Sequence, residues 1–186
     1  MSLIVLDRDG VVNEEVEDYL ASAEAWVPIP GSLEAMVRLA QTGHRLVIAS
    51  DQPAIGRGLI TPDVLFAIHR RMQRELAALG GSVDGLFFCP HLPEDDCHCR
   101  KPRPGLLEDI GRRFQTELEE VLVVGDQLGD LEAAISAGAR PVLVRTGRGE
   151  ATLAALDERP DVPVYRDLNE LSLALAEAGR AAESRP

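Results

Sequence analysis

Short, almost wholly apolar runs alternate with longer amphipathic segments along this chain, and this alternation restricts the possible fold most strongly. Runs of this kind are typical of parallel strands that are covered on both faces. We therefore expect an α/β fold, a doubly wound, Rossmann-like parallel sheet with helices on both faces. The expected strands are Leu3–Leu6, Arg45–Ala49, Leu86–Phe88, Val121–Val124 and Pro141–Val144.

Helix signals fill the segments between these runs. One helix should span residues 32–41, because Gly43 stands just past its apolar pattern. Another should begin after Thr61, an N-cap residue followed by proline, and stop before Gly80. Further helices are expected after Pro104, Gly129 and Asp167.

Length and charge set the class of protein. The 186 residues suffice for one domain, which we expect over residues 1–180, followed by a disordered tail at 181–186. The net charge of -12 disfavours nucleic acid and anionic membranes as partners. The first apolar stretch ends at Asp7, too early for a signal peptide, and no run approaches the roughly 20 residues of a membrane span. We expect a cytoplasmic monomer with reduced thiols that acts on a small molecule.

Carboxylates follow the first expected strand. In such sheets ligands bind at the carboxyl ends of the strands. Asp7 and Asp9 stand two apart there, so in extended chain both side chains leave the same side. Two close carboxylates repel each other, and a hard divalent cation such as Mg²⁺ removes that repulsion. The alternative is a polar turn in which Gly10 supplies backbone freedom.

Other strand ends add groups to the same edge. The second strand closes on Ser50, and the fourth is followed by Asp126 and Asp130. Lys101 precedes the third long helix. Carboxylates, a hydroxyl and an ammonium at one edge predict a site for a metal and a phosphoryl group. One carboxylate can attack phosphorus, while the cation and Lys101 neutralise charge and Ser50 donates a hydrogen bond.

These segments, DRDGVVN, Ser50, Lys101 and GDQLGD, resemble the four ordered motifs of haloacid dehalogenase superfamily phosphatases. The resemblance implies that Asp7 forms an aspartyl-phosphate, and that Asp9 protonates the leaving alkoxide and then activates water. It also implies that Asp7, Asp126 and the backbone carbonyl of Asp9 hold Mg²⁺. Asp130 would either orient the metal site or cap a helix.

All three cysteines lie in one loop, CPHLPEDDCHCRKP. Cys89 and His91, and Cys97 and Cys99, form two i, i+2 pairs, and three thiolates with one imidazole suit a closed, structural Zn²⁺ site. A disulfide would leave one cysteine unpaired, and a redox thiol is a further alternative. His98 lies between two ligands and should face solvent.

The zinc loop, residues 89–101, cannot bury a core of its own, so a metal would order it. The ordered loop would then carry Arg100 and Lys101 to the active edge. Removing the zinc should disorder this wall of the substrate pocket and lower activity, without removing the catalytic carboxylates.

The zinc loop, DQPAIGRG and VLVRTGRG together resemble the D-glycero-D-manno-heptose 1,7-bisphosphate 7-phosphatase family, to which the histidinol-phosphatase domain is related. The resemblance implies heptose supply for surface glycans. It also implies that Lys101 holds the phosphoryl group. The implied substrate contacts are Ser50, Asp51, Gln52, Pro53 and Arg100.

The chain departs from that family's pattern in three places. Ser50 replaces threonine, which keeps the hydroxyl, and the zinc loop is short, resembling the histidinol-phosphatase version in length as much as the heptose one. Asp51 stands where asparagine is expected, adding negative charge near a doubly phosphorylated substrate unless it points away or pairs with Arg57. Arg57 is a candidate for the distal phosphate and Asn13 for sugar hydroxyls, although a solvated arginine and a turn former are the simpler interpretations.

The predicted function is that of a capless, Mg²⁺-dependent phosphatase with structural Zn²⁺, which removes the 7-phosphate of a heptose 1,7-bisphosphate. The site should be open, because no large helical insert is present. One alternative is a phosphatase for histidinol phosphate or another small phosphomonoester. The other is a non-catalytic, zinc-clipped binding module.

Overall fold

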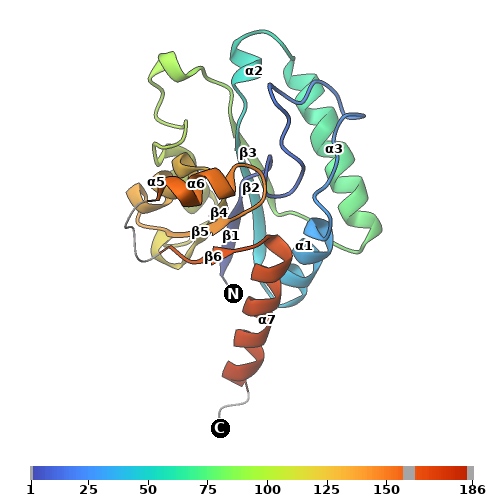
Figure 1. Cartoon of the computed structure of the whole chain (residues 1–186), viewed down its shortest axis with the longest axis vertical. Coiled ribbons are helices and arrows are strands. Elements are labelled where there is room, and N and C mark those ends of the chain that lie inside the picture. Colours follow the sequence, from blue (N-terminus) through green and yellow to red (C-terminus); the bar gives the residue numbers. More distant parts are fainter. Residues whose placement is uncertain (1, 157–161, 184–186) are drawn as a thin grey trace.

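The computed structural model describes residues 2–156 and 162–183. Its centre is one parallel sheet in the order β3-β2-β1-β4-β5-β6 (Figure 1). The strands are β1 Leu3–Leu6, β2 Arg45–Asp51, β3 Gly85–Cys89, β4 Leu122–Gly125, β5 Arg140–Val144 and β6 Val164–Tyr165. Strand β1 pairs with β2 and β4 on its two sides, so the residues after it stand at the middle of the sheet's carboxyl edge.

Five of these strands were predicted, each to within two residues at either end. Strand β6 was not, because two residues are too few to show an apolar pattern. Strand β2 continues to Asp51, because Ser50 and Asp51 still pair with Phe88 and Cys89 of β3. The ladder therefore carries the polar residues after Ala49 into the sheet edge.

The predicted helices are also present. They are α1 Ser32–Gln41, α3 Pro62–Ala78, α4 Gly105–Phe114, α5 Leu128–Ser136 and α7 Leu168–Glu183. Helix α5 begins two residues earlier than expected. The structure adds two short α-helices, α2 Pro53–Gly56 and α6 Gly149–Ala155, and two 3₁₀ turns, Pro93–Asp95 and Leu118–Glu120. Helices of one or two turns give too little periodicity to predict.

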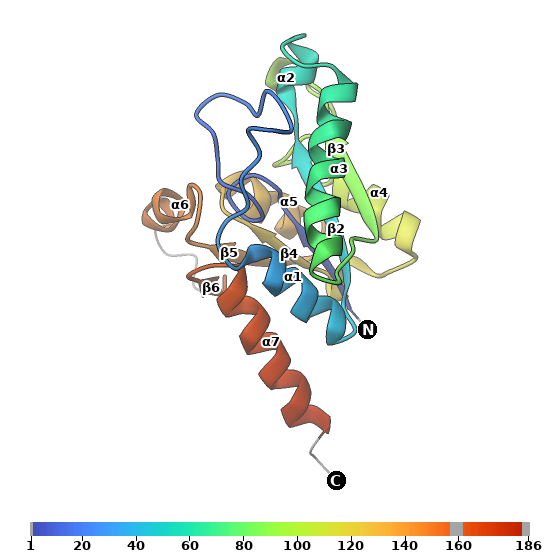
Figure 2. The same cartoon turned by 90° about the vertical axis from the view of Figure 1, so that its right-hand side faces the viewer.

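Helices cover both faces of the sheet. Alternate residues of β1 separate the two cores: Ile4 and Leu6 pack with α1, α3 and α7, and Leu3 and Val5 with α4 and α5. Figure 2 shows α1, α3 and α7 on the near side of the sheet. Burying each such aliphatic side chain contributes about 1.5–3 kcal/mol. The doubly wound arrangement predicted from the sequence is confirmed.

The segment between β1 and α1 is irregular yet fixed. Trp26, near the end of this segment that leads into α1, is fully buried in the core with α1 and α3. Isolated bridges join Asp9 to Asn13 and Asn13 to Pro28. Within residues 2–156 and 162–183 no folded cap module occurs between the elements, and none of the described helices is long and apolar enough to cross a membrane.

Helix α7 extends beyond the sheet toward the C-terminus (Figures 1 and 2). It ends at Glu183, so residues 181–183 of the expected disordered tail are helical. The rest of that tail, 184–186, lies outside the described residues.

Candidate active site

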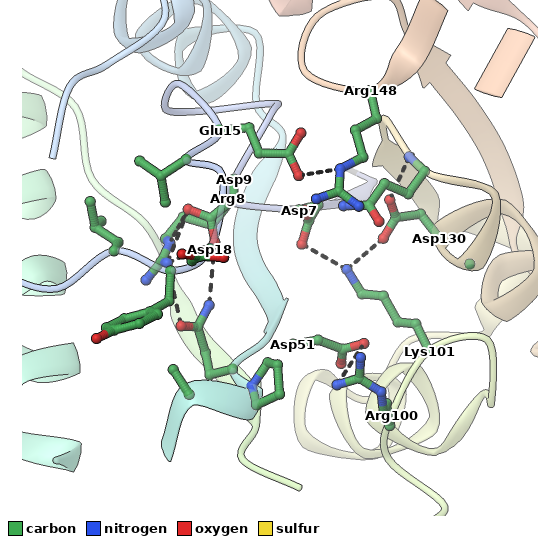
Figure 3. Close-up of a pocket in the computed structure, with 18 of the residues that line it drawn as sticks. Asp7, Arg8, Asp9, Glu15, Asp18, Asp51, Arg100, Lys101, Asp130 and Arg148 are labelled. Atoms are coloured by element: carbon green, nitrogen blue, oxygen red, sulfur yellow. Dashed lines mark hydrogen bonds and ion pairs between the residues drawn. The ribbon is translucent and has the colours of Figure 1, made fainter. Parts of the chain in front are cut away.

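A cavity of about 640 Å³ opens at the carboxyl edge of the sheet (Figure 3). Its wall combines acidic side chains from the ends of the strands with cations from the surrounding loops. The charged and polar residues that line it include Asp7, Arg8, Asp9, Glu15, Asp18, Asp51, Gln52, Arg57, Arg100, Lys101, Asp130 and Arg148. Most of the residues that the sequence placed at this edge therefore share one cavity.

Lys101 lies between two carboxylates. Its Nζ donates to Oδ1 of Asp7 at 2.8 Å, to Oδ1 of Asp130 at 2.6 Å and to the carbonyl of Ala49 at 2.8 Å. Burial alone would lower the pKa of Lys101, but the charges of Asp130 and Asp7 raise it above its ordinary value. The side chain is therefore a fixed ammonium facing the space beside Asp7 (Figure 3).

Asp130 takes part in the capping of helix α5 as its N3 residue, while its role in orienting the metal site stays a prediction. Its Oδ2 accepts from the backbone N–H of Gln127 at 3.0 Å, which caps helix α5, while Oδ1 accepts from Lys101. The cap explains why α5 begins at Leu128. One carboxylate thus fixes both the start of a helix and the position of the ammonium.

Asp126 is fully buried after β4. Its Oδ2 accepts from the backbone N–H of Arg148 at 2.8 Å, and its carbonyl accepts from the hydroxyl of Thr152 at 2.7 Å. Oδ1 has no hydrogen-bond partner among the described residues. Gly10 packs against this carboxylate with a φ of 82°, and a Cβ there would lie 2.2 Å from Oδ2. The motif therefore requires glycine for both space and conformation.

Asp7, Asp126 and Asp130 offer carboxylate oxygens that all lie within 4.8 Å of one another. Burial, and then the charges of Asp130 and Glu15, raise the pKa of Asp126 to about 7. A cluster of this kind, with one buried oxygen unpartnered, fits a hard divalent cation. These residues can therefore hold Mg²⁺.

Asp9 stands apart from this cluster. Its carboxylate pairs with the guanidinium of Arg8 at 2.7 Å and accepts from Nδ2 of Asn13 at 2.8 Å. Burial alone would raise the pKa of Asp9, but Arg8, Asn13 and Gln52 hold it below its ordinary value. The side chains of Asp7 and Asp9 thus line one cavity but have different partners. Because the carboxylate of Asp9 is paired with Arg8, the predicted Mg²⁺ ligand from Asp9 is its backbone carbonyl.

Two predicted site residues are buried beneath the cavity. Ser50 is 1% exposed, and its Oγ accepts from Nε2 of Gln52 at 3.2 Å. Asn13 is also 1% exposed and donates both to Asp9 and to the carbonyl of Glu14. The predicted contacts of Ser50 with a phosphoryl group and of Asn13 with a sugar remain predictions. In this structure Ser50 is hydrogen-bonded to Gln52, and Asn13 is hydrogen-bonded to Asp9.

Asp51 pairs with Arg100 rather than with Arg57. The distance from Oδ2 of Asp51 to Nη1 of Arg100 is 3.9 Å, and the pair forms one wall of the cavity (Figure 3). Burial raises the pKa of Asp51. Pro53 and Arg57 line the cavity as well. The extra negative charge that the sequence raised as a difficulty is thus partly balanced within the zinc loop.

The ligand atoms of Cys89, His91, Cys97 and Cys99 lie within 4.8 Å of one another. Cys89 Sγ is 3.6 Å from Cys97 Sγ and 3.3 Å from Cys99 Sγ, and His91 Nδ1 is 3.3 Å from Cys99 Sγ. All three cysteines are free thiols. Four soft or borderline donors at mutual distances of this size match the tetrahedral set that Zn²⁺ takes.

Comparison with known proteins agrees with this geometry. A family model described as HAD-hydrolase-like matches residues 98–171. The D-glycero-beta-D-manno-heptose-1,7-bisphosphate 7-phosphatase of Bordetella bronchiseptica is 50% identical over 154 residues, which cover 83% of this chain and 86% of the relative. The enzyme of the same name from Pseudomonas putida is 47% identical over 153 residues, 82% of this chain and 87% of the relative.

This chain belongs to the heptose 1,7-bisphosphate 7-phosphatase family.

A solved structure of a family member extends the match over the whole fold. The D,D-heptose 1,7-bisphosphate phosphatase from B. bronchiseptica, complexed with magnesium and phosphate, superposes with a TM-score of 0.93 at 46% identity. The match covers 96% of this chain and 99% of that one. The corresponding phosphatase from Burkholderia thailandensis gives a TM-score of 0.75 at 40% identity, covering 94% and 98%.

Sequence reasoning missed several residues of this phosphatase site. Arg8, between the two aspartates, is 1% exposed, and its position inside the DRD motif was the one signal for it. The backbone N–H of Arg148 and the hydroxyl of Thr152 hold Asp126, so the segment after β5 supports the metal cluster. Glu15 pairs with Arg148 at 2.6 Å across the cavity mouth. Only the three-dimensional fold brings these residues together.

Arg103 links the zinc loop of this chain to the residues that follow it. Its guanidinium donates to the carbonyl of Cys97 at 2.9 Å and pairs with Asp96. His98 turns outward, as predicted, with its side chain 68% exposed and Nε2 2.9 Å from Glu108. The zinc ligands and the loop's cations are therefore held by one short, cross-linked segment.

Proposed function

We propose that this chain is a Mg²⁺-dependent phosphatase that removes the 7-phosphate of D-glycero-β-D-manno-heptose 1,7-bisphosphate through an aspartyl-phosphate on Asp7. The observation that carries the proposal is the position of Lys101, between Asp7 and Asp130 at the edge of a carboxylate cluster. A phosphoryl group that approaches Asp7 there meets a fixed positive charge.

The residues divide the reaction into two steps. A carboxylate oxygen of Asp7 attacks phosphorus, the bond to the sugar oxygen breaks, and Asp9 gives that oxygen a proton. Asp9 then takes a proton from water, which attacks the phosphorus, releases inorganic phosphate and regenerates Asp7. Lys101 stabilises the charge on the phosphoryl oxygens in both steps, and Ser50 is assigned a hydrogen bond to the same oxygens.

Mg²⁺ would be held by Asp7, Asp126 and the carbonyl of Asp9, where it supplies positive charge that offsets the repulsion between the carboxylates and the phosphoryl group. Asp130 would orient this site through Lys101. Zn²⁺ would be held by Cys89, His91, Cys97 and Cys99, and its role would be structural because all four positions are filled by protein.

The assignment of the substrate rests on charge and on the relatives. Arg57 and Arg100 line the cavity in a chain of net charge -12, and guanidinium groups suit a second phosphate. The Bordetella and Pseudomonas relatives are named for the β anomer at 50% and 47% identity. A Mycobacterium tuberculosis relative named for the α anomer is 40% identical over 70% of this chain. The β anomer is therefore favoured.

The test is phosphate release from a panel of esters by protein of defined metal content. The panel contains both anomers of the heptose bisphosphate, histidinol phosphate and p-nitrophenyl phosphate. We expect the highest kcat/KM on the β bisphosphate, with loss of the 7-phosphate alone. Faster turnover of histidinol phosphate would move the assignment to that substrate, and no turnover of any ester with Mg²⁺ would favour a binding module.

We further propose a single phosphatase domain over residues 1–180 that acts as a monomer in the cytoplasm on a small sugar phosphate. Light scattering on the purified protein measures the oligomeric state directly, and a dimer would contradict the proposal.

A further inference from the structure

We infer that Arg8 is a positioning residue that fixes the carboxylate of Asp9 for proton transfer to the sugar oxygen. This inference rests on the proposed acid–base role of Asp9. It assigns a role to the central residue of DRD, which neither the sequence motifs nor the comparisons explain.

Two nitrogens of the Arg8 guanidinium donate hydrogen bonds to the carboxylate of Asp9. Nε donates to Oδ1 at 3.2 Å, and Nη2 donates to Oδ1 at 3.0 Å and to Oδ2 at 2.7 Å. The planar fork of arginine fixes the plane of the carboxylate as well as its place. Asn13 also donates a hydrogen bond to Oδ1, and Gln52 donates one to Oδ2. The orientation of the carboxylate is therefore set on both of its oxygens.

Arg8 is itself positioned by contacts with His69 and Gln52. Its Nη1 lies 3.5 Å from Nε2 of His69 on helix α3, and Nη2 lies 3.4 Å from Oε1 of Gln52. Burial, and then the charge of Arg8, lower the pKa of His69 to about 4. His69 is thus a neutral ring that presents an acceptor to the guanidinium. The core face of α3 thereby sets the place of Arg8.

Two other roles for Arg8 fit the structure less well. A substrate ligand needs free donors, but the Arg8 side chain is 1% exposed and faces Asp9, Gln52 and His69. A purely stabilising pair is also a weak explanation, because apolar residues of similar volume usually stabilise a core as well as a buried ion pair does. The partner of this buried charge is the carboxylate assigned to proton transfer. The same pair holds the pKa of Asp9 below its ordinary value, so Asp9 acts as the acid only after it takes up a proton, which weakens its hydrogen bonds to Arg8.

The experiment compares two phosphate esters in single-turnover and in steady-state assays, with Arg8→Gln as the variant. The heptose bisphosphate releases a basic alkoxide that needs the proton of Asp9, whereas p-nitrophenyl phosphate releases a weak base that leaves without one. We expect Arg8→Gln to slow release of the sugar by about 10²-fold with little change in KM, and release of nitrophenolate by less than about tenfold. Arg8→Lys should recover part of the loss.

A double variant tests whether the two residues act as one unit. Arg8→Gln combined with Asp9→Asn should be no slower than Asp9→Asn alone, because Arg8 then has no catalytic carboxylate left to position. The matched control is Arg45→Gln, which breaks an exposed Arg–Asp pair with Asp84 at the opposite end of β2 and should leave both esters unaffected.

Equal losses on the two esters, a raised KM with unchanged kcat, or additive losses in the double variant would each overturn the inference. If Arg8→Gln does not fold, the same comparison is made with Arg8→Lys, where equal losses count against it in the same way. A wild type that hydrolyses other alkyl esters but not the heptose bisphosphate would refute the substrate alone. Full activity of Asp9→Asn would refute the acid–base role and this inference with it.

Discussion

The ammonium of Lys101 lies 2.6 Å from Asp130, whose other carboxylate oxygen caps helix α5. Asp130→Asn keeps an oxygen for the cap but removes the charge that holds the ammonium. We expect kcat to fall by about 10–10²-fold with little change in Tm. Asp130→Ala should lose a similar amount of activity and, in addition, about 1 kcal/mol of unfolding free energy. Kinetics and thermal unfolding of the two variants check this; equal Tm values would contradict the cap.

Asp7 should be the residue that carries the phosphoryl group. Asp7→Asn removes the nucleophile, so we expect turnover to fall by at least about 10³-fold and no phosphoenzyme to form. Acid quenching with ³²P-labelled substrate detects the intermediate. Asp9→Asn, by contrast, should slow both steps and still yield a trapped phosphoenzyme. Substantial activity in Asp7→Asn would show that the nucleophile lies elsewhere.

The affinity for Mg²⁺ should depend on pH through Asp126. Because its pKa in the metal-free protein is raised to about 7, the carboxyl is protonated below that pH and must release a proton to bind the cation. The apparent affinity should be constant above pH 7 and weaken by up to about tenfold per pH unit below it.

Calorimetric titration of Mg²⁺ in two buffers of different ionisation enthalpy measures both the affinity and the proton released. Asp126→Asn serves as the control and should bind Mg²⁺ weakly at every pH. An affinity that does not change between pH 7 and more acidic conditions would contradict the raised pKa of Asp126.

Removing zinc should lower activity without unfolding the domain. The loop carries Arg100 and Lys101. Of the four ligands, only Cys99 packs against a hydrophobic core, and only Cys89, at the end of β3, is fully buried. We expect His91→Ala to lose zinc and most activity while its far-ultraviolet circular dichroism stays close to that of wild type.

His98→Ala is the matched control for this prediction. His98 stands between two ligands but faces solvent, so its replacement should keep a full equivalent of zinc and nearly full activity. Metal analysis of the two variants separates them. Loss of zinc from His98→Ala, with zinc retained in His91→Ala, would show that His98 and not His91 is the zinc ligand.

Asp51→Asn should improve binding of the doubly charged substrate. Asp51 lies 3.9 Å from Arg100 and adds a negative charge to the cavity wall. Removing one partly screened charge is worth about 1 kcal/mol, which corresponds to a KM for the bisphosphate lowered by about fivefold. The change should be smaller for p-nitrophenyl phosphate, and kcat should stay near wild type.

Glu17→Gln is the matched control. Glu17 is exposed, so this variant removes one negative charge outside the cavity wall and should leave the KM for the bisphosphate unchanged. A higher KM for the bisphosphate in Asp51→Asn would instead show that the carboxylate accepts a hydrogen bond from the substrate.

Much of the fold could be predicted because its signals are local. Five strands and five helices follow from apolar runs and helix boundaries such as Thr61, which caps α3 by accepting from Val64. Strand β6 and helices α2 and α6 escaped prediction because they are too short to show a period. Within the site, DRD and GDQLGD marked Asp7 and Asp126 because residues at the ends of parallel strands meet at one edge.

The sequence by itself determined the alternation of elements, the edge at which the carboxylates gather and the spacing of four zinc ligands, because each depends on neighbours within a few positions. Only the tertiary structure decided that Lys101 reaches Asp130, that Arg148 and Thr152 hold Asp126, and that His69 supports Arg8 beneath Asp9. Most of these contacts join residues far apart in the chain, and their geometry is set by how helices pack on the sheet, which no local pattern encodes.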